Sequence, residues 1–306
     1  LKKEKSIYIL AHYYQRDAIQ DIADFVGDSY SMAVAAKQSP YDLILVAGVD
    51  FMAESAAILC PGKTVLSPEP LATCPMAWML FFICQYICPM ANGITVADVL
   101  AYKEQHPSSV IVSYVNTPAA IKAVSDICCT SSNARKIVNK LPQNTATYFI
   151  PDQNLAINVA NKVGRKLDYF ASSCPIHARV TRDDLRIQKE AHPEAMILVH
   201  PECAPEVVAM ADYCGSTAGI INYALASSAS EFIIATECGV KHAINKANPD
   251  KQLHMASGNM LCPNMKSITL DKILHSMEQM QTIIRVPEDI RSRAAVALEK
   301  MIEYTA

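Results

Sequence analysis

Three Cys-Pro steps recur at nearly equal intervals, and their cysteines are the residues whose type and spacing best suit joint chemistry. Cys88 precedes Cys174 by 86 residues, and Cys262 follows Cys174 by 88 residues. A lone free cysteine most often fills space in a core. Three at one interval instead predict three similar units, each of which contributes one thiolate to a shared centre.

Three thiolates that converge from distant segments leave one coordination position of a bound metal open. This arrangement suits a 4Fe–4S cluster with a substrate-accessible iron that acts as a Lewis acid. Zinc with three cysteine ligands and one open position is the competing interpretation, since thiolates suit both metals. A local zinc finger is excluded, because its cysteines lie only a few residues apart. We assign packing roles to Cys60, Cys84, Cys128, Cys129, Cys203, Cys214 and Cys238.

Each unit also has a pair of polar residues, two positions apart, at the end of its first apolar run. In parallel α/β sheets, ligands bind outside the carboxyl ends of the strands, and residues two apart point to the same side. For one pair alone, an ordinary turn is the simpler interpretation. Three equivalent pairs predict a substrate site with groups that can move protons. The pairs are His12 with Tyr14, Tyr114 with Asn116, and His200 with Glu202.

Hydroxyl residues begin a helical pattern in each unit: Ser29, Ser131, and Ser216 with Thr217. Each alone is explained as a helix N-cap. If they meet at one cavity, the free N–H groups of the helix starts make a site for carboxylates or phosphate. The chain has neither a Walker loop nor a GxGxxG motif, so nucleotide binding is not indicated.

The elements that must position these residues are short apolar strands alternating with helices, a pattern typical of parallel sheets. We therefore predict three three-layer αβα domains, related by a pseudo-threefold axis around a central cluster site. The predicted domains are 1–93, 94–180 and 181–306, and the last includes helices over 269–280 and 288–303 that should close the outside. The expected strands are 7–11, 42–47 and 63–66, then 110–113, 126–130, 145–150 and 167–171, then 196–199, 211–214, 231–235 and 252–255.

The first unit is longer than the other two. Its first strand ends 102 residues before that of the second unit, whereas the second and third ends are 86 residues apart. The sequence Cys-Pro-Met-Ala occurs at Cys74 and again at Cys88, 14 residues later, and subtracting 14 from 102 leaves 88. We interpret the region near 74–91 as an insertion or tandem duplication that carries the apolar run 78–87.

Composition excludes several classes of protein. The chain is 51% hydrophobic and 19% charged, with a net charge of −3 and no basic stripe, so we expect an ordered enzyme that does not bind nucleic acid. The apolar run 78–87 is shorter than the ~20 residues that span a membrane. Eleven cysteines, an odd number, without a signal peptide favour a reducing cytoplasm.

With these residues assembled, the chain resembles the quinolinate synthase family, the iron–sulfur enzymes of NAD biosynthesis. The resemblance extends along nearly the whole chain, and many ordered motifs make it specific. The motifs are LAHYYQ, DIADFVGDSY, GVDFMAES, YVNT, DICCTSSNA, PDQNL, CPIH, HPEC, GSTAGI, TECGV and CPNMK.

The resemblance implies an activity and a role for each matching residue. The family condenses iminoaspartate with dihydroxyacetone phosphate to quinolinate, with loss of phosphate and water, and an aspartate-oxidising enzyme is the implied partner. Tyr14 and Glu202 are the implied acid–base residues, with His177 beside the cluster. The implied cluster ligands are Cys88, Cys174 and Cys262, and the implied substrate-binding residues are His12, Ser29, Tyr114, Asn116, Ser131, His200, Glu202, Ser216 and Thr217.

The chain departs from the family where Cys-Pro-Met-Ala occurs twice. The preceding residues LATCPMA favour Cys74 as the first ligand, whereas the following residues CPMANGITVADVL and the 86-residue interval favour Cys88, which we predict. Two alternatives stay open: another cluster-dependent hydro-lyase, and a metal-free or zinc-bound anion-binding relative inactivated by the duplication.

Overall fold

Each third of the chain builds one four-stranded parallel sheet from short apolar strands. The computed structural model describes residues 1–74 and 93–305, and the sheet orders are β2-β1-β3-β4, β6-β5-β7-β8 and β10-β9-β11-β12. This confirms the predicted α/β class. The strands are β1 (Ile7–His12), β2 (Phe25–Gly27), β3 (Leu43–Ala47), β4 (Thr64–Leu66), β5 (Val110–Tyr114), β6 (Ile127–Cys129), β7 (Thr147–Ile150), β8 (Asp168–Tyr169), β9 (Met196–Val199), β10 (Tyr213–Cys214), β11 (Glu231–Ala235) and β12 (Gln252–Met255).

Helices cover the sheets, so the inner strands are buried on both faces. In β3, β5 and β11 every residue after the first is buried, which explains their continuous apolar character. The helices are α1 (Asp17–Ile22), α2 (Ser29–Gln38), α3 (Asp50–Leu59), α4 (Val96–Gln105), α5 (Ala119–Lys122), α6 (Ala134–Lys140), α7 (Gln153–Val163), α8 (Arg182–Ala191), α9 (Pro205–Val208), α10 (Thr217–Ala226), α11 (Val240–Ala247), α12 (Pro263–Lys266), α13 (Leu270–Gln279) and α14 (Glu288–Thr305), with a 3₁₀ turn at His177–Arg179.

A repeated aspartate joins the first two strands of every unit. Its side chain accepts a hydrogen bond from a backbone N–H of the first strand, 15 residues earlier in the chain. The sequence analysis missed β2 because it is only three residues long and ends at a glycine, but its equivalents in the other units were predicted. The bonds run from Ile9 to Asp24 (2.8 Å), from Ile111 to Asp126 (2.8 Å) and from Ile197 to Asp212 (2.7 Å).

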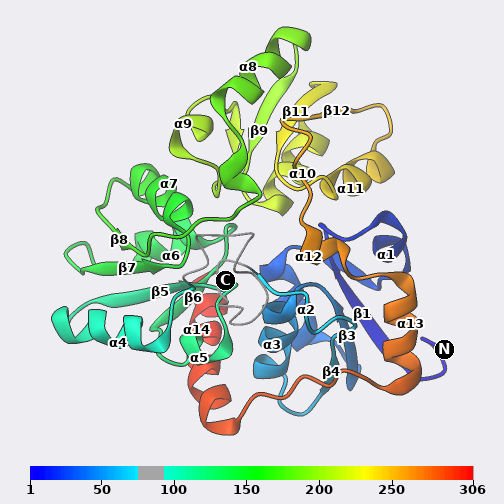
Figure 1. Cartoon of the computed structure of the whole chain (residues 1–306), viewed down its shortest axis with the longest axis vertical. Coiled ribbons are helices and arrows are strands. Elements are labelled where there is room, and N and C mark those ends of the chain that lie inside the picture. Colours follow the sequence, from blue (N-terminus) through cyan, green and yellow to red (C-terminus); the bar gives the residue numbers. More distant parts are fainter. Residues whose placement is uncertain (75–92, 306) are drawn as a thin grey trace, which may run out of the picture.

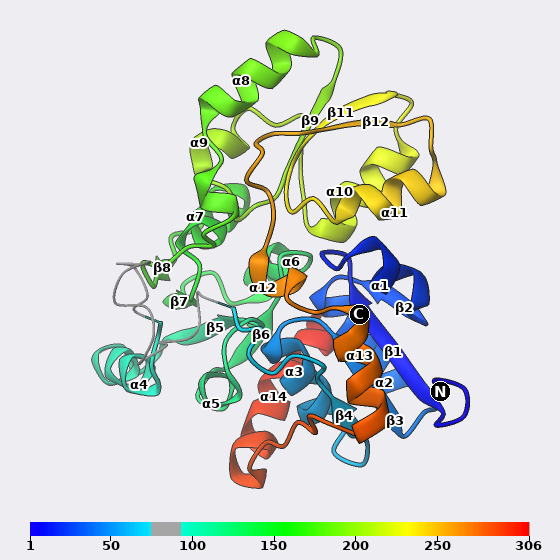
Figure 2. The ribbon, with the colours of Figure 1, turned by 45° about the vertical axis from the view of Figure 1, so that its right-hand side comes forward.

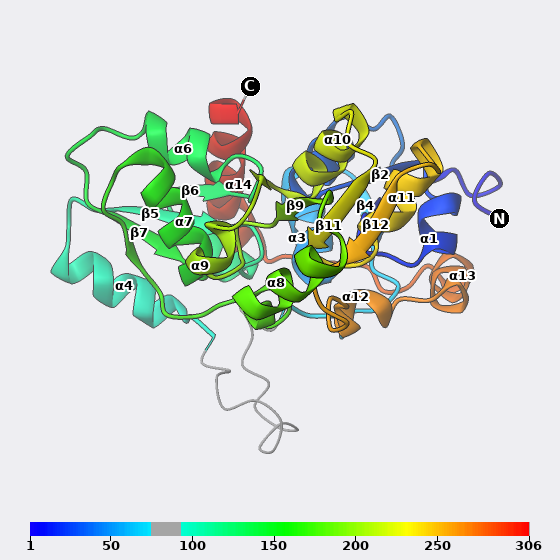
Figure 3. The same cartoon turned by 90° about the horizontal axis from the view of Figure 1, so that it is seen from above.

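The three units form a triangle around a common centre. Figure 1 shows β1–β4 at the lower right, β5–β8 at the left and β9–β12 at the top. The short helix α12 lies near the middle, between the third unit and the other two (Figure 2). The C-terminal helix α14 lies between the first and second units (Figure 3).

The C-terminal segments do not simply cover the outside, as the sequence analysis expected. Residue Ile283 forms an antiparallel bridge with Leu66 of β4, and α14 contacts α3, α5 and β6. The reason is a stripe of small and apolar residues at helical spacing that is fully buried between the units. The stripe consists of Ala294, Ala297, Leu298 and Met301. The predicted domain boundaries remain predictions.

The predicted insert falls outside the described residues, together with Cys84, Cys88 and the apolar run 78–87. Within 1–74 and 93–305, no helix is both long enough and apolar enough to cross a membrane.

The position of α14 predicts a stability difference between two residues of this helix. Leu298 is fully buried, whereas Val296 is 56% exposed. We expect Leu298→Ala to lower the free energy of unfolding by about 2–5 kcal/mol, because it leaves a cavity. Val296→Ala should change it by less than ~0.5 kcal/mol. Urea unfolding followed by circular dichroism measures both, and equal losses would contradict the buried packing of this face.

Candidate active site

One pocket lies where the three units meet, and most sequence-predicted residues line it. It contains about 870 Å³ of space free of protein atoms, including its open mouth. Ser216 is not among the lining residues, since its hydroxyl instead caps α10 by accepting from Gly219 N–H at 3.1 Å. Cys88 lies outside the described residues. The predicted residues that line the pocket are His12, Tyr14, Ser29, Tyr114, Asn116, Ser131, Cys174, His177, His200, Glu202, Thr217 and Cys262.

The strand-end pairs do more than share one side of a sheet. In two of them the backbone N–H of the second residue donates to Nδ1 of the histidine, from Tyr14 to His12 at 3.1 Å and from Glu202 to His200 at 3.3 Å. Burial, the largest influence, lowers the pKa of His12 and of His200 to about 3. Both imidazoles are therefore neutral, with the proton on Nε2. His200 Nε2 donates to Ser131 Oγ at 3.2 Å.

Glu202 is a buried carboxylate held in place by several partners. Burial alone would raise its pKa, but His200, His177 and hydrogen bonds from His177 and Tyr114 outweigh burial and lower it to about 2. His177 Nδ1 lies 2.9 Å from Glu202 Oε2. The loop that carries Glu202 is anchored by α7 of the second unit, where Asn154 Nδ2 donates to the Glu202 carbonyl at 3.1 Å.

A chain of hydroxyl groups continues from His177 into the third unit. His177 Nε2 lies 3.0 Å from Thr236 Oγ1, and the Tyr14 hydroxyl lies 2.8 Å from both Thr236 Oγ1 and Thr217 Oγ1. Burial raises the pKa of Tyr14 well above its ordinary value, so the phenol stays protonated. Because an ionised Glu202 can only accept, His177 Nδ1 is the donor to it, and the Thr236, Tyr14 and Thr217 hydroxyls continue this chain of hydrogen bonds.

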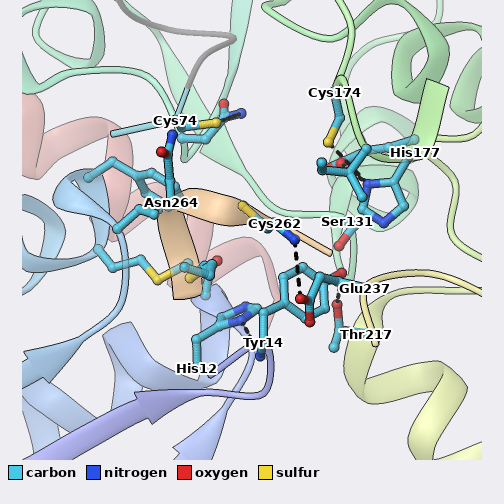
Figure 4. Close-up of a pocket in the computed structure, with 18 of the residues that line it drawn as sticks. His12, Tyr14, Cys74, Ser131, Cys174, His177, Thr217, Glu237, Cys262 and Asn264 are labelled. Carbon is cyan, nitrogen blue, oxygen red and sulfur yellow. Dashed lines mark hydrogen bonds and ion pairs between the residues drawn. The ribbon is translucent and has the colours of Figure 1, made fainter. Parts of the chain in front are cut away.

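Three thiols face a common space in the pocket, and each comes from the segment that follows the last strand of one unit. They belong to Cys74, Cys174 and Cys262 (Figure 4). Burial is the main cause that raises the pKa of the Cys174 and Cys262 thiols, so metal binding must displace their protons. Three convergent, half-buried thiols fit the donor set of a cluster with three protein ligands.

Each of these cysteines is held by a carboxylate that follows the third strand of a unit. Asp152 accepts the Cys174 N–H at 3.0 Å, after β7, and Glu237 accepts the Cys262 N–H at 3.2 Å, after β11. Asp50, after β3, accepts the backbone N–H of Cys74. We call Asp50, Asp152 and Glu237 the carboxylate anchors. They place Cys74 in the first unit as the equivalent of the two other cysteines.

The helix starts were predicted less accurately than the strand ends. Asp28, not Ser29, caps α2, since its Oδ1 accepts from Ser31 N–H at 2.9 Å, and Ser29 is the first helical residue. Ser131 precedes α6, whose N-cap is Asn133. The Ser216 cap of α10 is as predicted. Ser29, Ser131 and Thr217 still line the pocket, because the start of each segment points to the centre.

The sequence analysis missed the carboxylate anchors, of which Glu237 lines the pocket, and it gave Cys74 only as the alternative first ligand. A signal was present: each third-strand run is followed within a few residues by an acidic residue, in VDF, PDQ and TEC. It also missed Asn264 and Lys266. Asn264 lines the pocket, and Lys266 Nζ lies 3.1 Å from Glu237 Oε1. No periodicity marks these two residues, because they follow the last strand.

Comparisons with known proteins give one consistent result. The family model described as quinolinate synthetase A protein matches residues 1–82 and 83–303. The two matched segments meet between the two Cys-Pro-Met-Ala copies. Quinolinate synthase of Methanosarcina barkeri is 46% identical over 302 residues, which cover 99% of this chain and 94% of that protein.

Relatives from distant organisms match equally completely. Quinolinate synthase of Thermodesulfovibrio yellowstonii is 44% identical over 304 residues, covering 99% of this chain and 95% of its own length. That of Thermus thermophilus is 41% identical over 315 residues, covering 99% and 94%. With the three-sheet architecture and the pocket at its centre, these matches show that the chain belongs to the quinolinate synthase family.

Proposed function

We propose that this chain condenses iminoaspartate with dihydroxyacetone phosphate to quinolinate, with loss of phosphate and water, in a pocket that holds a 4Fe–4S cluster. Family membership supports the reaction. The observation that carries the cofactor is the convergence of the Cys74, Cys174 and Cys262 thiols on one pocket. When bound, the cluster supplies a Lewis-acidic iron that polarises a substrate oxygen.

The first ligand in this proposal is Cys74 rather than Cys88, the residue predicted from the sequence. Two observations support it: Cys74 lines the pocket, and its N–H is bound by Asp50 as the N–H groups of Cys174 and Cys262 are bound by Asp152 and Glu237. Cys88 stays the alternative, since it lies outside the described residues.

Neutral donors would bind the substrate carboxylates and phosphate. His12 Nε2–H points away from the backbone N–H that fixes its Nδ1, and Ser29, Ser131 and Thr217 add hydroxyls. Ser29 and Thr217 are the first residues of ten-residue helices, whose N-terminal dipoles also favour anions. Hydrogen bonds from uncharged donors stabilise an anion while allowing the product to leave.

Proton transfer in this proposal uses the chain of hydrogen bonds from Thr217 to Glu202. An ionised Glu202 can take a proton from substrate carbon or nitrogen, and His177 and Tyr14 can pass protons along the chain of short hydrogen bonds. Since condensation and dehydration each need a proton removed and a proton returned, one relay can serve both.

We also propose that the protein works in a reducing cytoplasm, where its thiols stay available. Cys174 and Cys262 are free cysteines. Iminoaspartate, as an imine, hydrolyses in water, so an aspartate-oxidising enzyme is the proposed source.

Cys174, His177 and Glu202 have ligand atoms within 4.8 Å of one another, which is the observation that favours the zinc alternative. Analysis of the bound metal distinguishes the iron–sulfur cluster from zinc.

The reaction is tested with the anaerobically reconstituted protein. We expect quinolinate and phosphate in equal amounts, and Glu202→Gln should lower kcat by about 10²–10⁴-fold, because the proton acceptor is lost. Glu206→Gln, at an exposed position four residues away, is the control and should keep full activity. An iron-loaded protein without this activity would favour another hydro-lyase.

The ligand assignment is tested by iron and sulfide analysis of single variants. Cys74→Ala should lose the cluster and its visible absorption, whereas Cys88→Ala and the exposed-site control Cys214→Ala should keep about four irons per chain. Cluster loss in Cys88→Ala alone would restore the sequence-based prediction. Stoichiometric zinc without iron would support the zinc alternative.

The carboxylate anchors predict an effect on cluster retention that does not depend on activity. The two carboxylate oxygens of Asp152 accept from the N–H groups of Leu155, at 2.7 Å, and Cys174. The side-chain amide of Asp152→Asn has only one oxygen, so one of these two hydrogen bonds is lost. We expect the cluster to be lost to a chelator about tenfold faster or more, as when residues that orient metal ligands are changed. The matched surface variant is Asp183→Asn. Unchanged loss rates would show that the anchors are not needed for the cluster.

A further inference from the structure

Two histidines and a glutamate gather at the opposite end of the third sheet from the pocket. His192 ends α8 as its C-cap, Glu231 begins β11, and His254 lies on β12. In the parallel register Ile233 pairs with His254, so Glu231 and His254 are on the same side of the sheet. The third unit is at the top of Figure 1.

Both imidazoles lie within hydrogen-bond distance of the same carboxylate oxygen. His192 Nδ1 is 2.8 Å and His254 Nε2 is 2.9 Å from Glu231 Oε1. The two rings are stacked with centroids 3.5 Å apart and planes inclined by 18°. The potential ligand atoms of all three residues lie within 4.8 Å of one another. Segments from three separate elements therefore deliver two nitrogens and one oxygen to one point.

We infer that His192, Glu231 and His254 form a binding site for a divalent transition-metal ion such as Zn²⁺ or Co²⁺, separate from the cluster. Two histidines and one carboxylate are the protein ligands of open zinc sites, with water at the remaining positions. A hard oxygen-only ion such as Mg²⁺ is disfavoured by the nitrogen ligands.

The geometry needs only a small change to accept the ion. Ligand atoms of a tetrahedral zinc site lie about 3.3 Å apart, which follows from bond lengths near 2.05 Å. The two nitrogen-to-oxygen distances of 2.8 and 2.9 Å must therefore open by about 0.5 Å. The ion displaces the proton from His192 Nδ1 and His254 Nε2, and each ring keeps its proton on the other nitrogen.

The site is accessible and independent of the pocket. The side chains of His192, Glu231 and His254 are 29%, 22% and 25% exposed, which gives an ion a path of entry. Glu231 begins β11 and the pocket residue Glu237 follows its end, so the four steps from Glu231 to Ala235 place about 13 Å between the two ends of the strand. An ion here would link the end of α8 to β11 and β12.

Cobalt binding by the untagged protein tests the inference. We expect one Co²⁺ per chain, with visible d–d absorption and without the near-ultraviolet charge-transfer band of a cobalt–thiolate bond. His254→Gln and His192→Gln should each weaken this binding at least about tenfold. Zn²⁺ should raise the thermal unfolding temperature of the parent protein but not of these variants.

The control is His242→Gln, which removes another half-buried histidine of the third unit beside two aspartates. His242 Nε2 lies 3.0 Å from Asp21 Oδ1. This variant should bind Co²⁺ like the parent protein. Parent-like binding by both His254→Gln and His192→Gln, a thiolate band, or equal loss in His242→Gln would overturn the inference. The titration uses the iron-loaded protein, in which the pocket thiols are occupied, because free pocket thiols would bind Co²⁺ themselves and give a thiolate band.

Discussion

The buried, ionised carboxylate of Glu202 is the interaction on which the centre of this structure depends. A carboxylate removed from water is costly unless hydrogen bonds satisfy it. Here Tyr114 comes from the second unit, His177 from the segment after β8, and Asn154 of α7 holds the backbone of the loop. The second and third units must therefore meet at this position, and the Tyr14 hydroxyl joins the first unit to it through Thr236 and His177. The pocket is the space between them.

Carboxylates with hydrogen-bond donors also position the cysteine thiols. A cysteine loop at the rim of a sheet has free backbone N–H groups, and each carboxylate anchor accepts one of them. Asp152 and Glu237 are themselves fully buried. Burying Asp152 and Glu237 beside the pocket is explained by positioning rather than by stability, because the anchors orient the segments that carry the thiols.

Two buried histidines of the pocket are neutral, in contrast to the ionised Glu202. His12 and His200 are held uncharged by burial and oriented by the N–H two residues later. The internal repeat thus extends beyond the strands to single hydrogen bonds, as it does for the aspartates Asp24, Asp126 and Asp212. A second copy of such a bond is evidence that it belongs to the architecture.

Sequence alone determined the features that repeat locally. Apolar runs at regular spacing identified the parallel sheets, because strands buried on both faces need continuous apolar residues. The polar pairs at their ends identified the pocket residues, because the carboxyl ends of parallel strands lie at one edge. The intervals between Cys-Pro steps predicted that three units share a centre, where the pocket lies, and the excess of 14 residues predicts an insert outside the described residues.

Tertiary structure decided what depends on contacts between distant segments. Sequence spacing favoured Cys88, which lies outside the described residues, whereas the Asp50 contact and the pocket bring Cys74 beside Cys174 and Cys262. The caps Asp28 and Asn133 and the packing of α14 between two units were likewise invisible, because each is set by local backbone geometry or by a partner surface. The chain of hydrogen bonds from Thr217 to Glu202 exists only in the folded protein, where residues up to 222 positions apart come within 2.8 Å.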